Sequence, residues 1–169
     1  VTASVAPKPM VVANDDGTLS RSAFSATSLT SLNCTASGNN ATCYGPNASA
    51  TADSASALGN SATAAGAEAT ALGRAANASK IRALAIGDLA TASGSTSIAL
   101  GPSATASKKS AIAVGRDSDA SGEASTALGN QATASGLLST ALGSGAIAYS
   151  SSSTALGSEA SSNGVAATS

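Results

Sequence analysis

The sequence predicts an all-β fold, a parallel β-solenoid (β-roll) made of coils of 14 residues. One observation is a glycine at every fourteenth residue: Gly45, Gly59, Gly73, Gly87, Gly101, Gly115, Gly129, Gly143 and Gly157. From Gly59 onward the preceding residue is aliphatic, and the residue before that is alanine. Columns that stay in phase over so many turns indicate a repeat architecture. The period is too short for a two-helix repeat, which needs roughly 33–47 residues.

Each coil has room for two short strands and two tight turns. We number coil positions from the recurring glycine, which is position 0. Small residues return at positions 3 and 5, as in Ala62 and Ala64, which is the alternation of a strand. A second glycine often stands at position 7, as in Gly66 and Gly94. Glycine suits both turns because it adopts positive φ without steric cost. Coils stacked about 4.8 Å apart then give two parallel sheets back to back.

The alanine columns and the aliphatic column lie on opposite faces of their strands. Alanine suits the tight interior of a flattened coil, which leaves the aliphatic column at position 13 pointing outward as a continuous stripe. Monomers rarely expose such a stripe, so we expect self-association around an axis. The expected interface residues are Leu58, Leu72, Ile86, Leu100, Val114, Leu128, Leu142 and Leu156. The reverse assignment, with leucine inside and alanine outside, is the alternative.

Residues 1–44 do not follow the period and are interpreted as an N-terminal cap, followed by repeats over residues 45–169. Cys34 and Cys43 lie within the cap segment, nine residues apart around a turn. They could close a small disulfide loop, which would imply an oxidising location outside the cytoplasm. Two free buried thiols are the alternative. The pattern stops at residue 169 without a cap, which suggests a piece of a longer protein.

Composition argues against several classes of function. The net charge of −1 gives no general attraction to nucleic acid, and no stretch approaches the roughly 20 apolar residues of a membrane span. The chain has no histidine, which removes histidine-dependent triads and histidine metal sites. Asp117 and Asp119 stand two apart, a spacing compatible with a paired-carboxylate site, but are interpreted as solvated turn residues. We therefore predict no catalytic, cofactor-binding or metal-binding residues and no enzyme activity.

One cluster of charges calls for a binding hypothesis. Lys80, Arg82, Lys108 and Lys109 occupy positions 7 to 9, on one edge of coils two turns apart. The stacking distance places the two groups roughly 10 Å apart. This band is a candidate site for a polyanion, such as a sulfated glycan or an acidic matrix protein. Ordinary solubilising charge is the alternative interpretation.

The repeat unit itself resembles a known family. The run Ser125-Thr126-Ala127-Leu128-Gly129-Asn130-Gln131-Ala132-Thr133-Ala134-Ser135-Gly136 is similar to the YadA-like head repeat of trimeric autotransporter adhesins. The resemblance implies a left-handed parallel β-roll, assembled as a homotrimer and displayed on the outer membrane of a Gram-negative bacterium. It also implies attachment to host cell-surface or extracellular-matrix molecules. The segment from Cys34 to Cys43 departs from the repeat.

Two other functions are weighed against adhesion. One is an ice-binding or other structural solenoid without an adhesive role. The ice-binding class needs a flat threonine array, and Thr63, Thr91, Thr105 and Thr133 do share a column. That column is interrupted at Asn77, Asp119 and Ile147. A solenoid enzyme acting on polysaccharide would need clustered acids or an aromatic platform, and the chain has only two tyrosines, one phenylalanine and no tryptophan. The sequence therefore favours an adhesin head.

Overall fold

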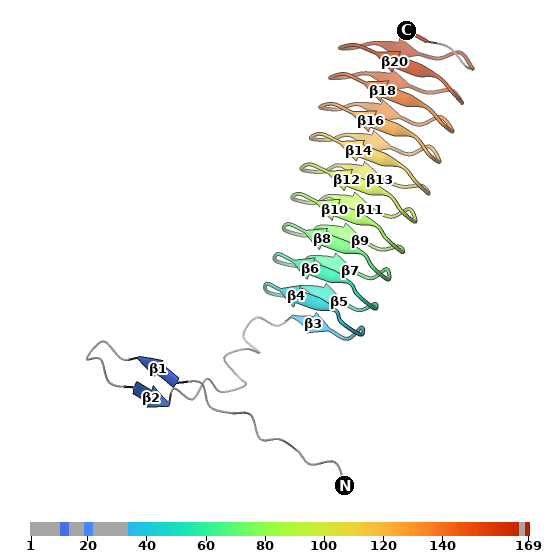
Figure 1. Ribbon diagram of the computed structural model, residues 1–169. Coiled ribbons are helices and arrows are strands. Elements are labelled where there is room, and N and C mark those ends of the chain that lie inside the picture. Colours follow the sequence, from blue (N-terminus) through green and yellow to red (C-terminus); the bar gives the residue numbers. More distant parts are fainter. Residues whose placement is uncertain (1–10, 14–18, 22–33, 166–167) are drawn as a thin grey trace.

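The computed structural model describes residues 11–13, 19–21, 34–165 and 168–169. All the regular secondary structure within these residues is β-strand (Figure 1). Strands β1 (Val11–Ala13) and β2 (Leu19–Arg21) form an antiparallel pair, with Val11 opposite Arg21. All later strands belong to one solenoid. Most of the segment interpreted as a cap from the sequence lies outside the described residues.

The solenoid consists of two parallel sheets whose strands alternate along the chain. The ten-stranded sheet contains β3 (Thr35–Ala36), β5 (Ser49–Ala50), β7 (Thr63–Ala64), β9 (Asn77–Ala78), β11 (Thr91–Ala92), β13 (Thr105–Ala106), β15 (Asp119–Ala120), β17 (Thr133–Ala134), β19 (Ile147–Ala148) and β21 (Ser161–Ser162). The nine-stranded sheet contains β4 (Thr42–Tyr44), β6 (Ser56–Leu58), β8 (Thr70–Leu72), β10 (Leu84–Ile86), β12 (Ile98–Leu100), β14 (Ile112–Val114), β16 (Thr126–Leu128), β18 (Thr140–Leu142) and β20 (Thr154–Leu156).

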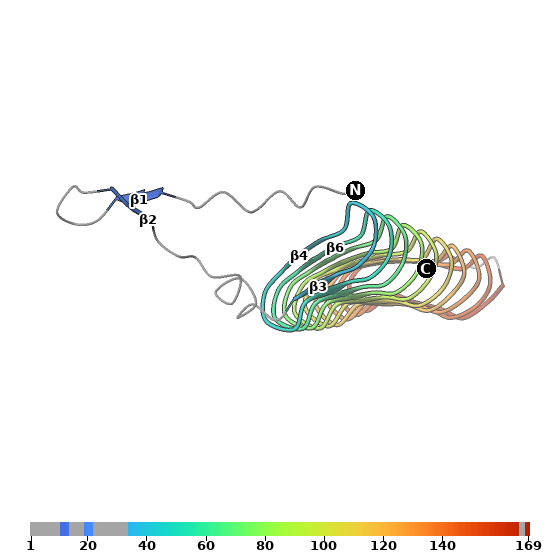
Figure 2. The same cartoon turned by 90° about the horizontal axis from the view of Figure 1, so that it is seen from below.

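Strand register confirms the predicted coil of 14 residues. Leu84 pairs with Ile98, and Ile98 pairs in turn with Ile112. The bonds between coils are ordinary ladder bonds, such as the Thr70 amide donating to the Ala83 carbonyl at 2.9 Å. Seen along the stack, each coil is a flattened loop (Figure 2). The chain is therefore an all-β parallel solenoid, as the sequence predicted.

The interior is filled by alanine, at positions 3, 5, 10 and 12. In the coil of Gly59 these are Ala62, Ala64, Ala69 and Ala71, each with no exposed surface. This confirms alanine inside and excludes the reverse assignment. The largest fully buried side chains among the described residues are serines: Ser97, Ser118, Ser125, Ser139 and Ser153.

Most of these buried serine hydroxyls bond to the backbone of their own turn. Ser97 and Ser125 each donate to the carbonyl three residues earlier, on Gly94 and Gly122, at 2.7 Å. In these coils the exchange of alanine for serine adds a polar group that is hydrogen-bonded, whereas the Ser139 hydroxyl is buried without a partner. The interior therefore has room for one extra oxygen atom where a carbonyl lies beside it.

The two turns need glycine for different reasons. At position 0 the glycine has positive φ, as in Gly87 at 135°, and a Cβ there would lie 2.5 Å from the carbonyl oxygen of Gly101. At position 7 the glycine does not have positive φ. A Cβ on Gly94 would instead overlap the carbonyl group of Lys108 in the next coil. The expected positive φ in this second turn falls on position 9, as in Arg82 at 55°.

Position 7 also differs between neighbouring coils. Gly66 and Gly94 are buried, whereas Lys80 and Lys108, in the coils that follow them, are exposed. The same change from glycine to a larger residue occurs from Gly38 to Ala52 and from Gly136 to Ser150. Each of these glycines lies directly against the backbone of position 7 in the next coil. A coil with a larger residue at position 7 therefore follows a coil with glycine there. Along much of the solenoid the structural unit is therefore two coils.

The solenoid begins before the predicted boundary at residue 45. Thr35 of β3 pairs with Ser49, and Cys43 of β4 pairs with Ala57. Counting back from Gly45 places Cys34 at position 3 and Cys43 at position 12, both normally alanine. The segment therefore obeys the coil geometry, although cysteine replaces alanine at positions 3 and 12 and Tyr44 replaces the aliphatic residue at position 13. At the other end, Thr168 forms a parallel bridge with Thr154.

Replacing an inward alanine with a large residue should destabilise the solenoid. In Ala99→Leu the added atoms would have to fit between two sheets separated only by alanine and serine side chains. We expect a loss of about 1–3 kcal/mol in the free energy of unfolding, measured by thermal or denaturant unfolding. The outward Ile98→Leu exchange in the same strand is the matched control and should unfold like the wild type. Equal stability of the two variants would contradict the tight interior.

Candidate functional surfaces

The outer face of the nine-stranded sheet carries an apolar stripe. All the predicted interface residues point outward from it at position 13, with Leu100 41% and Leu156 59% exposed. Leu72, Leu128 and Leu142 are also exposed, whereas Leu58, Ile86 and Val114 are half-buried. The structure thus brings the whole column together on one surface.

A second apolar column widens this stripe in its middle. Leu84, Ile98 and Ile112 stand at position 11 of three consecutive strands, on the same outer face as the position 13 column. The strands that carry them, β10, β12 and β14, lie side by side (Figure 1). Toward both ends the same column is threonine or serine, as at Thr70 and Thr126. The most apolar part of the stripe is therefore central.

The outer face of the ten-stranded sheet carries mainly short polar side chains. Position 4 is threonine in five of the ten strands and position 6 is mostly serine, as in Thr91 and Ser93. The column at position 4 is interrupted at Asn77, Asp119 and Ile147, so the regular threonine array of an ice-binding solenoid is absent from it. The two faces of the solenoid thus differ sharply in chemistry.

Asp119 lies in strand β15 and not, as the sequence interpretation had it, in a turn. Its strand neighbours in register are Thr105 and Thr133. Burial raises the pKa of the Asp119 carboxyl, and a hydrogen bond with Ser121 opposes this only in part. Its Oδ1 atom is buried without a hydrogen-bond partner. Asp117, which is in the turn, instead pairs with Arg116 at 2.6 Å, so the two carboxylates have separate surroundings.

Asp119→Thr should therefore stabilise the protein at neutral pH. The native state disfavours the charged carboxylate, and threonine would continue the column of Thr105 and Thr133. A carboxyl whose pKa is raised in the folded state lowers the free energy of unfolding at pH values above the ordinary pKa of aspartate. It has no effect at pH values where the carboxyl is protonated in both the folded and the unfolded state. The gain should accordingly shrink as the pH falls through the range in which aspartate titrates. Unfolding curves at neutral and acidic pH test this, and a gain that persists unchanged in acid would contradict it.

The predicted basic band lies on one edge of the solenoid, where the ten-stranded sheet turns into the nine-stranded one. Lys80, Lys108 and Lys109 are exposed there, and among the described residues none of them forms an ion pair. Arg82 differs, because its Nε lies 3.0 Å from Oε2 of Glu68 in the preceding coil. The hydrogen bond and charge of Glu68 raise the pKa of Arg82 further. The free positive charge of the band is thus on the lysines.

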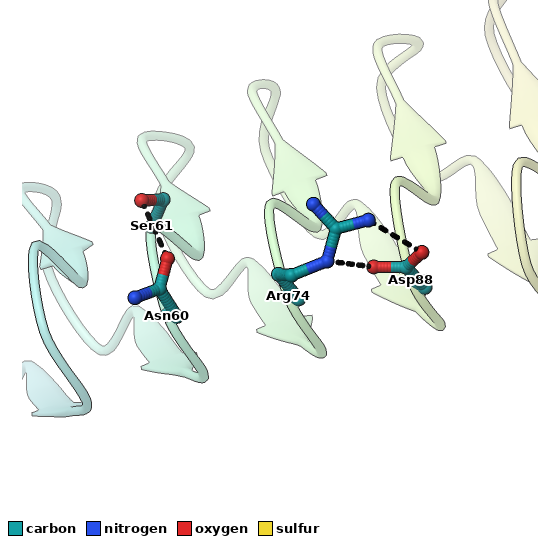
Figure 3. A network of polar contacts seen from close by, with 4 residues as sticks. All are labelled: Asn60, Ser61, Arg74 and Asp88. Atoms are coloured by element: carbon teal, nitrogen blue, oxygen red, sulfur yellow. Dashed lines mark hydrogen bonds and ion pairs between the residues drawn. The ribbon is translucent and has the colours of Figure 1, made fainter.

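The opposite edge carries paired charges (Figure 3). Arg74 contacts Asp88 in the next coil twice, with Nε 2.7 Å from Oδ1 and Nη2 2.8 Å from Oδ2. Asn60 accepts a hydrogen bond from Ser61 nearby, at 3.0 Å. Exposed pairs of this kind contribute about 0–1 kcal/mol. Sequence analysis missed both the Arg74–Asp88 and the Glu68–Arg82 pairs, although a separation of 14 residues would have indicated them.

The two cysteines face one another across the interior of the first coil. The structure joins Cys34 and Cys43 by a disulfide, with their Cα atoms 6.0 Å apart. Both side chains pack against the alanine core and are partly buried. No group of three or more potential metal ligands occurs among the described residues.

These features define a class of protein, a parallel β-solenoid with one apolar and one hydroxyl-rich face. A family model described as the YadA head domain repeat, in two copies, matches residues 50–76, 64–90, 92–118, 120–146 and 134–160. The chain therefore belongs to the YadA head family, the head domains of trimeric autotransporter adhesins. Each match covers about two coils, the unit that the alternation at position 7 also indicates. No curated protein matches the chain. Within the described residues there is no helix that could span a membrane.

Proposed function

We propose that this chain is an adhesin head that works as a parallel homotrimer of left-handed rolls. The observation that carries the proposal is the outward apolar stripe on the nine-stranded sheet. Around a threefold axis, three identical stripes would bury one another, because in-register copies place apolar columns at the same height. The hydroxyl-rich ten-stranded sheet would then face the solvent.

Membership of the YadA head family supports a location on the bacterial surface and a role in adhesion. We propose display on the outer membrane surface of a Gram-negative bacterium and attachment to host cell-surface or extracellular-matrix molecules. An interior filled with alanine offers no ligand cavity of about 300 Å³ or more, so binding would use the outer surface. A surface repeated in every coil and every chain lets weak contacts add, raising avidity roughly 10²–10⁴-fold.

A band of lysines is our proposed contact for acidic partners. Lys80 and Lys108 protrude from alternate coils because the glycine at Gly94 must lie between them against the backbone. Lys109 adds a charge beside Lys108. Arg82 contributes less, since Glu68 already neutralises it. A sulfated glycan or an acidic matrix protein has the complementary charge.

The trimer is tested by Leu100→Asp. This substitution would place an unpaired charge in the middle of the proposed interface, so we expect monomers in light scattering or sedimentation where the wild type is a trimer. The matched control is Ser93→Asp, at position 6 on the opposite face. The neighbouring coils have the uncharged Ser79 and Ser107 at this position, so this variant should remain a trimer. A monomeric wild type at micromolar concentration would overturn the proposal.

The lysine band is tested by changing Lys80, Lys108 and Lys109 together to serine. We expect weaker binding to an immobilised sulfated glycan at low salt, and the part lost should be the part that salt removes from the wild type. The controls are Arg82→Ser, expected to weaken binding less, and Arg74→Ser on the opposite edge, expected to leave binding unchanged. If the triple variant binds like the wild type at low salt, the lysines only solubilise the protein.

A further inference from the structure

We propose that the Cys34–Cys43 disulfide is an oxidation-dependent clasp for the first coil, residues 34–44. When the bridge is closed, the first coil remains docked on the solenoid. When the bridge is reduced, the first coil opens, while the coils beyond it stay folded. The redox state of the surroundings would then decide whether the folded solenoid includes this first coil.

The bridge lies where it can connect the two sheets. Cys34 occupies position 3, just before β3 of the ten-stranded sheet, and Cys43 occupies position 12, in β4 of the nine-stranded sheet. The next coil has Ala48 and Ala57 at these positions, and both are buried. In that coil the two sheets meet only through small side chains. In the first coil a covalent bond crosses the interior instead.

Among the residues that the structure describes, the first coil has a neighbouring coil on one side only. β3 and β4 are the last strands of their sheets. Their bonds run toward the second coil: the amides of Thr35, Ser37 and Thr42 donate to Ala48, Ala50 and Ala55. In a solenoid each coil is held mainly by its neighbours, so an end coil has about half the usual interface.

Burial in the first coil is correspondingly poor. Ala36 stands at position 5, where Ala50 and Ala64 are fully buried, yet it is exposed. Ala41, at position 10, is only half-buried. With little apolar burial and bonds on one face, this coil would open more readily than any interior coil. The disulfide compensates at the place where packing is weakest.

Closing the clasp is a two-electron oxidation. The Cys34 and Cys43 thiols together lose two electrons and two protons as the S–S bond forms. The oxidant is a disulfide, small or protein-bound, which accepts them and leaves as two thiols. A loop of about ten residues loses enough chain entropy on cross-linking to shift the equilibrium between closed and open by on the order of 100-fold.

Amide hydrogen exchange of the whole chain, with and without dithiothreitol, tests the clasp. The reporters are the amides of Thr35, Ser37 and Thr42, and the interior reference is Thr70, which donates to Ala83 in the same way as Thr42 donates to Ala55. We expect reduction to speed exchange at the three reporters by on the order of 100-fold. Exchange at Thr70 should not change.

The matched variant is Cys34→Ala with Cys43→Ala, which restores the residue that the repeat has at both positions. It keeps small apolar side chains inside but removes the bond. It should exchange fast at the three reporters with or without dithiothreitol. Slow exchange in this variant or in the reduced wild type would overturn the proposal, because packing alone would then hold the coil. Faster exchange at Thr70 on reduction would also overturn it, since the bridge would then support the whole solenoid.

Discussion

The close approach of the two sheets is the constraint on which the rest of this structure depends. Only alanine and serine side chains fit between them along the interior coils. Every larger apolar side chain therefore has to point outward. The stripe of Leu72, Leu100 and Leu128 is thus a consequence of the narrow interior. A fold that cannot bury its leucines within one chain has reason to bury them between chains.

The same constraint explains why repetition matters for stability. Apolar burial contributes roughly 25 cal/mol per Å², and an alanine offers little area, so one coil gains little alone. What each coil does gain is a full set of ladder bonds to both neighbours, such as those of Thr70 to Ala83 and of Gly73 to Leu58. Stability then accumulates by stacking, and the ends are where it is lowest. The position of the Cys34–Cys43 bridge fits this distribution.

The period alone predicted the coil length, the parallel register and the inward alanine columns, because each depends on one residue type recurring at one position. Details that depend on the next coil were not predicted. The glycine at position 7 was attributed to positive φ, whereas Gly94 is needed because the backbone of Lys108 approaches closely. Cys34 and Cys43 were placed in a cap because they lack the alanine of the repeat, although both obey its geometry. The pairing of Arg82 with Glu68 required reading the sequence with a step of 14.

Packing inside the solenoid also limits where charge can stand on its edge. A residue with a long side chain at position 7, such as Lys80, follows a coil whose position 7 is glycine, because that glycine lies against its backbone. Lys80 and Lys108 are consequently two coils apart, roughly 10 Å at the usual strand spacing. The spacing of the two position 7 lysines that a partner would meet therefore follows backbone contacts within the roll. A change in the position 7 glycines would alter the pattern of the lysine band even if every lysine were kept.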